Sequence, residues 1–199
     1  MLYPAQAVDG VVHLLGGKEL RAQLEAVPAN GEGDVGQPLR CAVGEAVVTR
    51  GCGELNFDLV AHAVPPFWAD PSWERLLRRC YSSSLDALAA EAPPSGTAPA
   101  ALWIASPLVG AGARGAPKRE AARVVVSELM RRLAADAEPS AAAEEPPPRA
   151  PPPRDLRFRV VVLPGDGQAA FRAVAEAVDA ESAQCQAVEA RAHCVDGAP

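Results

Sequence analysis

The stretch PLVGAGARGAPK, residues 107–118, decides the fold prediction. It follows an apolar run at residues 100–109 (AALWIASPLV) and precedes residues 118–137, in which apolar side chains recur at helical spacing. Glycines let such a turn bend tightly and bring its backbone close to a ligand. Successive N–H groups and the start of a helix then form an anion site. The predicted phosphate-binding residues are Gly110, Ala111, Gly112, Ala113, Arg114 and Gly115.

Two alternatives accompany this interpretation of the turn. The same glycine spacing occurs in dinucleotide-binding folds, which place an acidic residue about 20 positions further on, at the end of the next strand. Here the next predicted strand, residues 156–163 (LRFRVVVL), lies beyond a proline-rich stretch, so we expect no nicotinamide cofactor. The other alternative is a tight turn without a ligand.

Strands and helices are predicted to alternate along the chain. Strands are expected at residues 8–15, 44–50, 56–64, 100–109 and 156–163, and helices at 18–27, 72–91, 117–137 and 168–180, with a loop at 28–38. In the last helix Phe171, Val174 and Val178 are expected to face the core. This order predicts an α/β layered fold with a mostly parallel central sheet.

The proline-rich stretch divides the chain. Residues 139–153 contain two Pro-Pro-Pro runs and predict a semi-extended linker or insertion, for which a proline-recognition partner is the alternative role. The main domain is expected over residues 1–138, the insertion over 139–154, and the domain's final strand and helix over 155–180. Residues 181–199 show no sustained pattern and predict a disordered tail.

Composition limits the classes of function. The net charge of −6 argues against a general nucleic-acid binder, because that task needs many cations. Five cysteines are irregularly spaced with no C-x-x-C pair, so we expect free thiols and no metal site or cofactor. No basic leader and no apolar run of about 20 residues is present, which predicts neither a signal peptide nor a membrane span. We expect an intracellular protein, cytoplasmic or nuclear.

Several segments, in the same order, resemble a macro domain, the ADP-ribose-binding module. Residues 8–12 (VDGVV) are similar to its V-D-A-I-V strand, and residues 44–51 (GEAVVTRG) with Leu55 to its G-E-A-V-x-T-x-G-x-x-L segment. Residues 62–66 (HAVPP) resemble H-A-V-x-P, Cys80-Tyr81 with Leu85 resembles C-Y-x-x-x-L, and residues 107–118 resemble P-L-L-G-T-G-x-x-G-x-P-K. The resemblance implies a three-layer α/β/α sandwich with a mixed central sheet, and a loop at 110–115 that wraps the diphosphate of an ADP-ribose-like ligand.

The departures from the family pattern point to a divergent or N-terminally truncated member. His13-Leu14-Leu15-Gly16 replaces N-A-A-N, whose second Asn contacts the distal ribose. The residues expected on the distal-ribose side are therefore His13, Gly16, Gly17 and Glu19. No counterpart of the adenine-binding G-D-I segment precedes Val8, and the position of an adenine-stacking aromatic falls near Leu163-Pro164. Arg114 replaces a residue that is often aromatic, and either pairs with phosphate or points to water.

No catalytic residue is assigned. His62 lies in an apolar run and is expected to be a hydrogen-bonded core histidine, and His13 has no visible carboxylate or nucleophile partner. The sequence therefore favours a module that binds ADP-ribose or an ADP-ribosylated protein without hydrolysing it. The alternatives are an ADP-ribosylhydrolase with substitute residues, Glu19 or His13, and a ligand-free scaffold. A Gly110→Glu variant is expected to lose phosphate binding and keep its fold.

Overall fold

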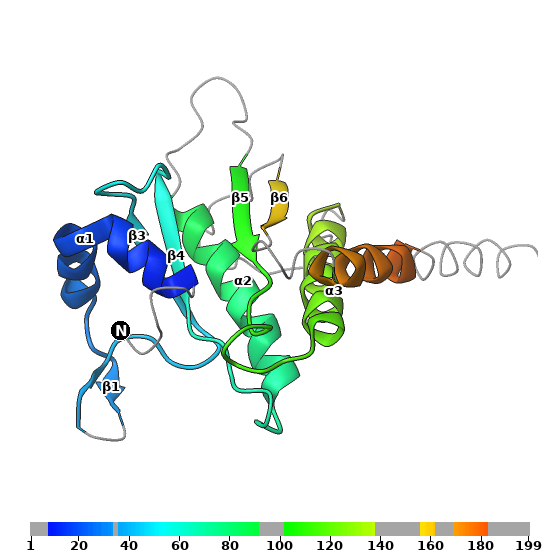
Figure 1. Ribbon diagram of the computed structural model, residues 1–199, viewed down its shortest axis with the longest axis horizontal. Helices are drawn as coiled ribbons and strands as arrows, with labels where there is room; N and C mark the ends of the chain where they lie inside the picture. Colours follow the sequence, from blue (N-terminus) through cyan, green and yellow to red (C-terminus); the bar gives the residue numbers. More distant parts are fainter. Residues whose placement is uncertain (1–7, 34–35, 92–101, 138–155, 162–168, 183–199) are drawn as a thin grey trace, which may run out of the picture.

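The computed structural model describes residues 8–33, 36–91, 102–137, 156–161 and 169–182 (Figure 1). The predicted insertion at 139–154 and all but the first residues of the predicted tail lie outside these ranges. Within them no helix is long and apolar enough to cross a membrane.

The described strands form three two-stranded ladders. β3 (Ala46–Arg50) pairs antiparallel with β4 (Leu59–Ala63), with Val48 opposite Ala61. β5 (Leu102–Pro107) pairs parallel with β6 (Leu156–Val161), with Ile104 opposite Phe158. β1 (Gly31–Glu32) and β2 (Pro38–Leu39) make a short antiparallel hairpin in the predicted loop. The mixed α/β class is confirmed, and the parallel pairing among the described strands is confined to β5–β6.

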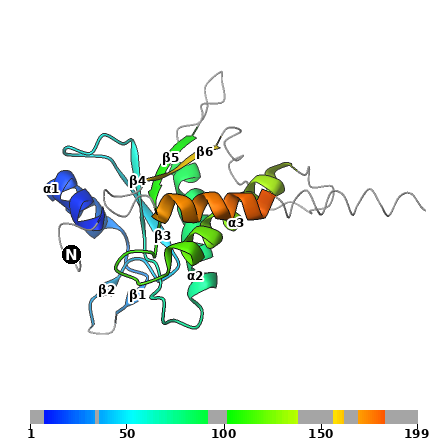
Figure 2. The same ribbon diagram turned by 45° about the vertical axis from the view of Figure 1, so that its right-hand side comes forward.

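Helices lie on both sides of the β3–β4 ladder. α1 (Val8–Ala26) packs on β3, and α2 (Trp73–Glu91) packs on β3, β4 and α3 (Lys118–Ala137). Figures 1 and 2 show α1 on one side of β3–β4, with α2 and α3 toward the other side. The core lies between α2, α3 and β6, where Leu77, Val124 and Val125 are almost fully buried.

The predicted strand at residues 8–15 is wrong, because these residues form the first half of α1. The run has strand-forming side chains, but it pairs with none of the described strands, and a helix satisfies its backbone groups internally. Few of its side chains are buried, and Leu14 is 68% exposed. Gly17 kinks the helix with φ 61°, and beyond it Leu20 is fully buried, in agreement with the helix predicted at 18–27.

The final helix, residues 169–182, confirms the predicted element but faces the core differently (orange in Figure 1). Ala170, Ala173 and Ala177 are buried, whereas Phe171 is 70% exposed and Val178 is also exposed. Val174 is partly buried against the core. Small side chains let two helices approach closely, so the alanine stripe rather than the larger side chains faces the core.

Candidate functional site

The turn between β5 and α3 is closed by hydrogen bonds within its own backbone. The amide of Ala111 donates to the carbonyl of Leu108 (3.2 Å), that of Gly115 to Gly112 (2.9 Å), and that of Ala116 to Gly110 (3.0 Å). Gly110 has φ 83° and Gly115 has φ 81°, in the left-handed region that favours glycine. The predicted strand–turn–helix unit is therefore present, and its glycines are needed where the chain reverses.

Three amides of this turn are the candidates to bind a ligand. Among the described residues, the N–H groups of Gly110, Gly112 and Ala113 donate to no protein acceptor. Gly112 and Ala113 are exposed, while Leu108 and Ala116 on either side of the turn are buried. Exposed N–H groups on a fixed turn before a helix can bind an anion.

Tyr81 anchors the base of the turn to α2. Its hydroxyl oxygen accepts a hydrogen bond from the amide of Val109 (3.1 Å), directly before Gly110. Tyr81 is almost fully buried, and burial raises the pKa of its phenol. The sequence pattern places Tyr81 in the helical C-Y-x-x-x-L motif and predicts no role for it at this turn. Its position on the apolar face of a predicted helix could have indicated such a role, since a buried phenol needs a hydrogen-bond partner.

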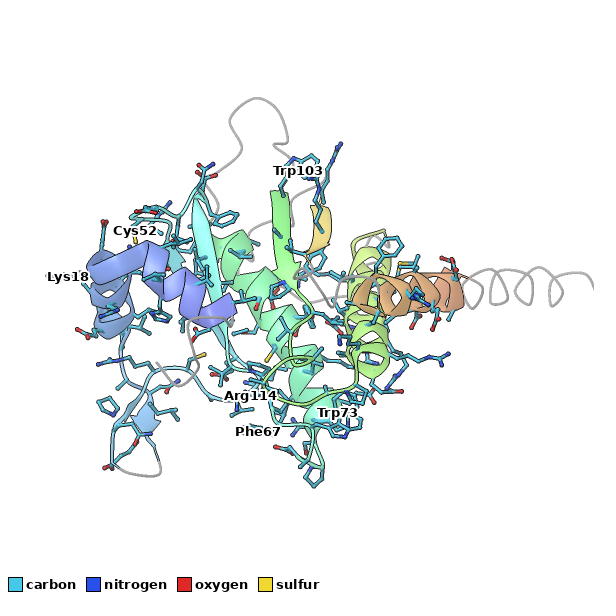
Figure 3. All side chains as sticks on the ribbon, in the orientation of Figure 1. Lys18, Cys52, Phe67, Trp73, Trp103 and Arg114 are labelled. Atoms are coloured by element: carbon cyan, nitrogen blue, oxygen red, sulfur yellow. The ribbon has the colours of Figure 1, made fainter. Side chains whose placement is uncertain are left out.

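A second contact holds the rim of the turn. The amide of Trp68 donates to the carbonyl of Arg114 (2.9 Å), and the Arg114 guanidinium lies over the Phe67 ring, 4.3 Å from its centroid. Figure 3 shows the two labelled side chains together below the turn. Neither Phe67 nor Trp68 could be assigned to the site from local sequence, because both α2 and β5 separate them from Arg114 in the chain.

The two central glycines differ in what a side chain would meet. A Cβ at Gly110 would lie 3.4 Å from Leu77 Cδ1 in the core, on a backbone with positive φ. A Cβ at Gly112 would meet nothing within 4 Å. This geometry argues against the expectation that Gly110→Glu keeps the fold. Gly112 is instead the position at which binding can be tested separately from folding.

The residues predicted on the distal-ribose side lie in α1, at and beside its kink. Gly16 packs against Leu20 and Leu55, and the carbonyl of Leu15 accepts a hydrogen bond from the amide of Glu54 (2.9 Å). In Figure 3 Lys18 lies beside Cys52 and far from Arg114. Within the described part of the chain, no hydrogen bond, ion pair or ring contact joins His13, Gly16, Gly17 or Glu19 to the turn at 110–115. Their role beside a ribose stays a prediction.

His62 has the surroundings of a core histidine. Its Nε2 lies 2.9 Å from Thr49 Oγ1 across the β3–β4 ladder. Burial, with a smaller contribution from His13, lowers its pKa to about 4. His13 itself lies 3.5 Å from Asp9 in α1. His62 is therefore a neutral, bonded side chain at neutral pH.

The thiols that the structure describes are unpaired. Cys41, Cys52 and Cys80 are free, and burial raises the pKa of Cys80 to about 12. A thiol with so high a pKa is a poor nucleophile at neutral pH. No group of three His, Cys, Asp or Glu side chains in the described ranges is arranged to hold a metal ion.

Similarity to known proteins identifies the family of this chain. Residues 1–125 match the family model of the Macro domain. The chain belongs to the macro domain family. A macro domain-containing protein of Listeria monocytogenes is 31% identical over 121 residues, which cover 60% of this chain and 60% of that protein. O-acetyl-ADP-ribose deacetylase 1 of Pantoea vagans is 30% identical over 129 residues, which cover 64% of this chain and 66% of that protein. This macro domain chain thus spans less than two thirds of the length of these relatives.

Solved macrodomains share the fold. The Oceanobacillus iheyensis macrodomain with ADP superimposes with a TM-score of 0.61 at 20% identity, covering 87% of this chain and 77% of that chain. The Trypanosoma brucei macrodomain in complex with ADP gives a TM-score of 0.54 at 21% identity, covering 84% of this chain and 56% of that chain. The predicted macro-domain fold is confirmed.

Proposed function

We propose that this macro domain is a divergent binding module that holds ADP-ribose, or another phosphate-bearing ligand, on the turn at residues 110–115 and does not hydrolyse it. The observation that carries the proposal is the set of amides at Gly110, Gly112 and Ala113, which donate to no acceptor among the described residues. Tyr81 and Trp68 fix the backbone around them, so the donors are organised before a ligand arrives.

Two findings support a nucleotide diphosphate as the ligand class. Two macrodomains of the same fold, from Oceanobacillus iheyensis and Trypanosoma brucei, have been solved with ADP. The turn offers several adjacent N–H donors, which suit the clustered oxygens of a diphosphate. An ADP-ribosylated protein is the partner that this ligand class suggests.

Hydrolysis of an ADP-ribose derivative is the second candidate function. It is favoured by relatives named O-acetyl-ADP-ribose deacetylase. Against it, residues 13–16 replace the family's N-A-A-N segment and lie in α1, where His13 is paired with Asp9. Misplacing a reacting group by about 1 Å can lower a rate about 100-fold, so substitute residues would have to reach the ribose closely.

Calorimetric titration of the full chain with ADP-ribose, with AMP as the comparison ligand, tests the proposal. We expect micromolar binding of ADP-ribose and no measurable binding of AMP. Gly112→Glu should abolish binding because its carboxylate enters the anion site, and Gly112→Ala is the matched control. Absence of heat at millimolar ADP-ribose would contradict both ligand-binding candidates and favour a ligand-free scaffold.

Turnover is measured separately. The chain is incubated with O-acetyl-ADP-ribose and with an ADP-ribosylated protein, and the release of acetate and of ADP-ribose is followed. Binding without release supports the binding module. Release that Gly112→Glu abolishes would support the enzyme instead.

A further inference from the structure

Arg114 is the cationic side chain of the turn, and its position is set from outside the turn. The guanidinium lies 4.3 Å from the centroid of the Phe67 ring, which belongs to the connection between β4 and α2. Phe67 is 55% exposed, so its ring is not buried in the core and contacts the guanidinium at the surface. A cation over an aromatic face is attracted by the ring's quadrupole, and the planar guanidinium stacks well on such a face.

The Phe67 ring is carried by a tightly bonded turn. The amide of Asp70 donates to the carbonyl of Phe67 (3.0 Å), and that of Trp73 donates to the carbonyl of Asp70 (2.9 Å). The carboxylate of Asp70 accepts a hydrogen bond from the amide of Ser72 (2.7 Å). These bonds join Phe67 to the first turn of α2.

The neighbouring residue fastens this segment to the loop. The amide of Trp68 donates to the carbonyl of Arg114 (2.9 Å), and the Trp68 ring packs on the Trp73 ring with centroids 4.4 Å apart. Both the backbone and the side chain of Arg114 are thus held by residues 67–68. Side-chain entropy that is already lost in the free protein does not oppose binding.

We propose that Phe67 positions the Arg114 guanidinium as a subsite that binds the second phosphate of a diphosphate, beside the phosphate on the loop amides. The inference rests on the proposed function. Arg114 binds the charged phosphate, and Phe67 positions Arg114. Arg114 follows Ala113, one of the exposed amide donors, so a phosphate on the amides brings its neighbour within reach of the adjacent side chain. A guanidinium can bind phosphate oxygens through two parallel hydrogen bonds.

The test is titration of the full chain and its variants with ADP-ribose at low and moderate salt. Arg114→Gln should weaken binding about tenfold, since it removes a charge-assisted hydrogen bond. It should also reduce the salt dependence of the dissociation constant, because one ion contact is lost. Phe67→Leu should weaken binding about threefold by removing the cation–π contact. The double variant should bind as Arg114→Gln does, because Phe67 acts only through Arg114.

Arg114→Lys separates charge from stacking. It should keep the salt dependence and recover only part of the affinity, because an ammonium keeps the charge but lacks the planar face that stacks on Phe67 and the two parallel donors that bind phosphate. Matched controls are Phe57→Leu, at a similarly exposed ring near the β3–β4 turn, and Arg50→Gln, at an exposed, ion-paired arginine. Both controls should bind as the wild-type chain does.

The outcomes distinguish the two proposals. If the wild-type chain does not bind ADP-ribose, the proposed function fails and this inference fails with it. If Gly112→Glu abolishes binding while Arg114→Gln binds as wild type does, the function stands and the subsite is wrong. If the Phe67→Leu effect persists unchanged in the Arg114→Gln background, Phe67 does not act through Arg114, and the positioning role is overturned.

Discussion

The Tyr81 hydroxyl accepts a hydrogen bond from the amide of Val109, at 3.1 Å, and so joins the middle of α2 to the last residue before the turn at 110–115. Tyr81 is almost fully buried, and its ring also meets Phe158 of β6 edge-on, with centroids 6.4 Å apart. One side chain therefore connects the helix layer, the parallel strand pair and the turn. Fixed donors in the turn depend on this connection.

Removing the hydroxyl alone tests that dependence. Tyr81→Phe keeps the ring but leaves the Val109 amide without its acceptor, and should lower the free energy of unfolding by about 1–2 kcal/mol. Urea denaturation measures the change, and calorimetry should show weaker ADP-ribose binding. Ser82→Ala is the control, because among the described residues the Ser82 hydroxyl bonds only carbonyls of its own helix and should be dispensable. Equal stability of Tyr81→Phe and wild type would mean that Tyr81 does not anchor the turn.

Substitutions at Gly110 should lower stability, whereas Gly112→Glu should change ligand binding without lowering stability. Gly110→Ala places a Cβ 3.4 Å from Leu77 on a backbone with φ 83°, and should lower stability by about 1–2 kcal/mol. Gly112→Ala meets no atom within 4 Å and should be nearly neutral. Gly112→Glu should keep the wild-type melting temperature and lose ADP-ribose binding. Loss of stability in Gly112→Glu would show that the two positions cannot be separated in this way.

Local pattern was sufficient to predict most of the elements around the turn. Apolar runs bounded by turn residues predicted β3, β4 and β5, and the helical spacing of apolar side chains predicted α2 and α3. The glycine pattern predicted the turn, because positive φ at Gly110 and Gly115 is a local requirement.

What the sequence did not predict depends on neighbours distant in the chain. Residues 8–15 have strand-forming side chains but are helical in the fold, where His13 lies beside His62 of β4. The final helix buries alanines because of how closely it packs, which apolar spacing alone does not reveal. The Phe67–Arg114 and Tyr81–Val109 contacts join segments that only the fold brings together.

Docking of α1 on the turn after β3 depends on Gly53. A Cβ there would lie 2.3 Å from the carbonyl oxygen of Leu15, and φ is 63°. Gly17 has a similar φ of 61° but no atom within 4 Å of an added Cβ. Gly17 has ψ −144°, a region that L side chains rarely adopt, so Gly17→Ala should cost about 1–2 kcal/mol from backbone strain alone. Gly53→Ala should cost roughly 2–4 kcal/mol, because backbone must also move.

Thermal and urea unfolding of the two variants measure this difference directly. Because an added Cβ at Gly17 meets no neighbour, the loss there reports backbone strain alone, and a larger loss at Gly53 reports the contact between α1 and the turn. Equal losses of stability in the two variants would show that α1 is not held against Gly53 in solution.

Acid should destabilise this macro domain through His62. Burial, and secondarily His13, lowers the pKa of His62 to about 4 in the folded chain, against 6.5 ordinarily, while Asp9 opposes the shift. Between these values the unfolded chain binds the proton and the folded chain does not. The stabilising contribution is therefore complete above about pH 6.5 and is lost as the pH falls toward 4. From pH 7 to pH 5 the loss should be about 2 kcal/mol.

His62→Gln tests this pH dependence, because glutamine can still bond Thr49 but does not titrate. Urea denaturation at a series of pH values should give a flatter stability curve for His62→Gln than for wild type between pH 6.5 and 4. His13→Gln should retain most of the wild-type slope, since burial rather than His13 is the larger cause of the shift. Parallel curves for His62→Gln and wild type would show that His62 is not buried in its neutral form. The α1–β3–β4 packing around His62 would then differ from the arrangement described.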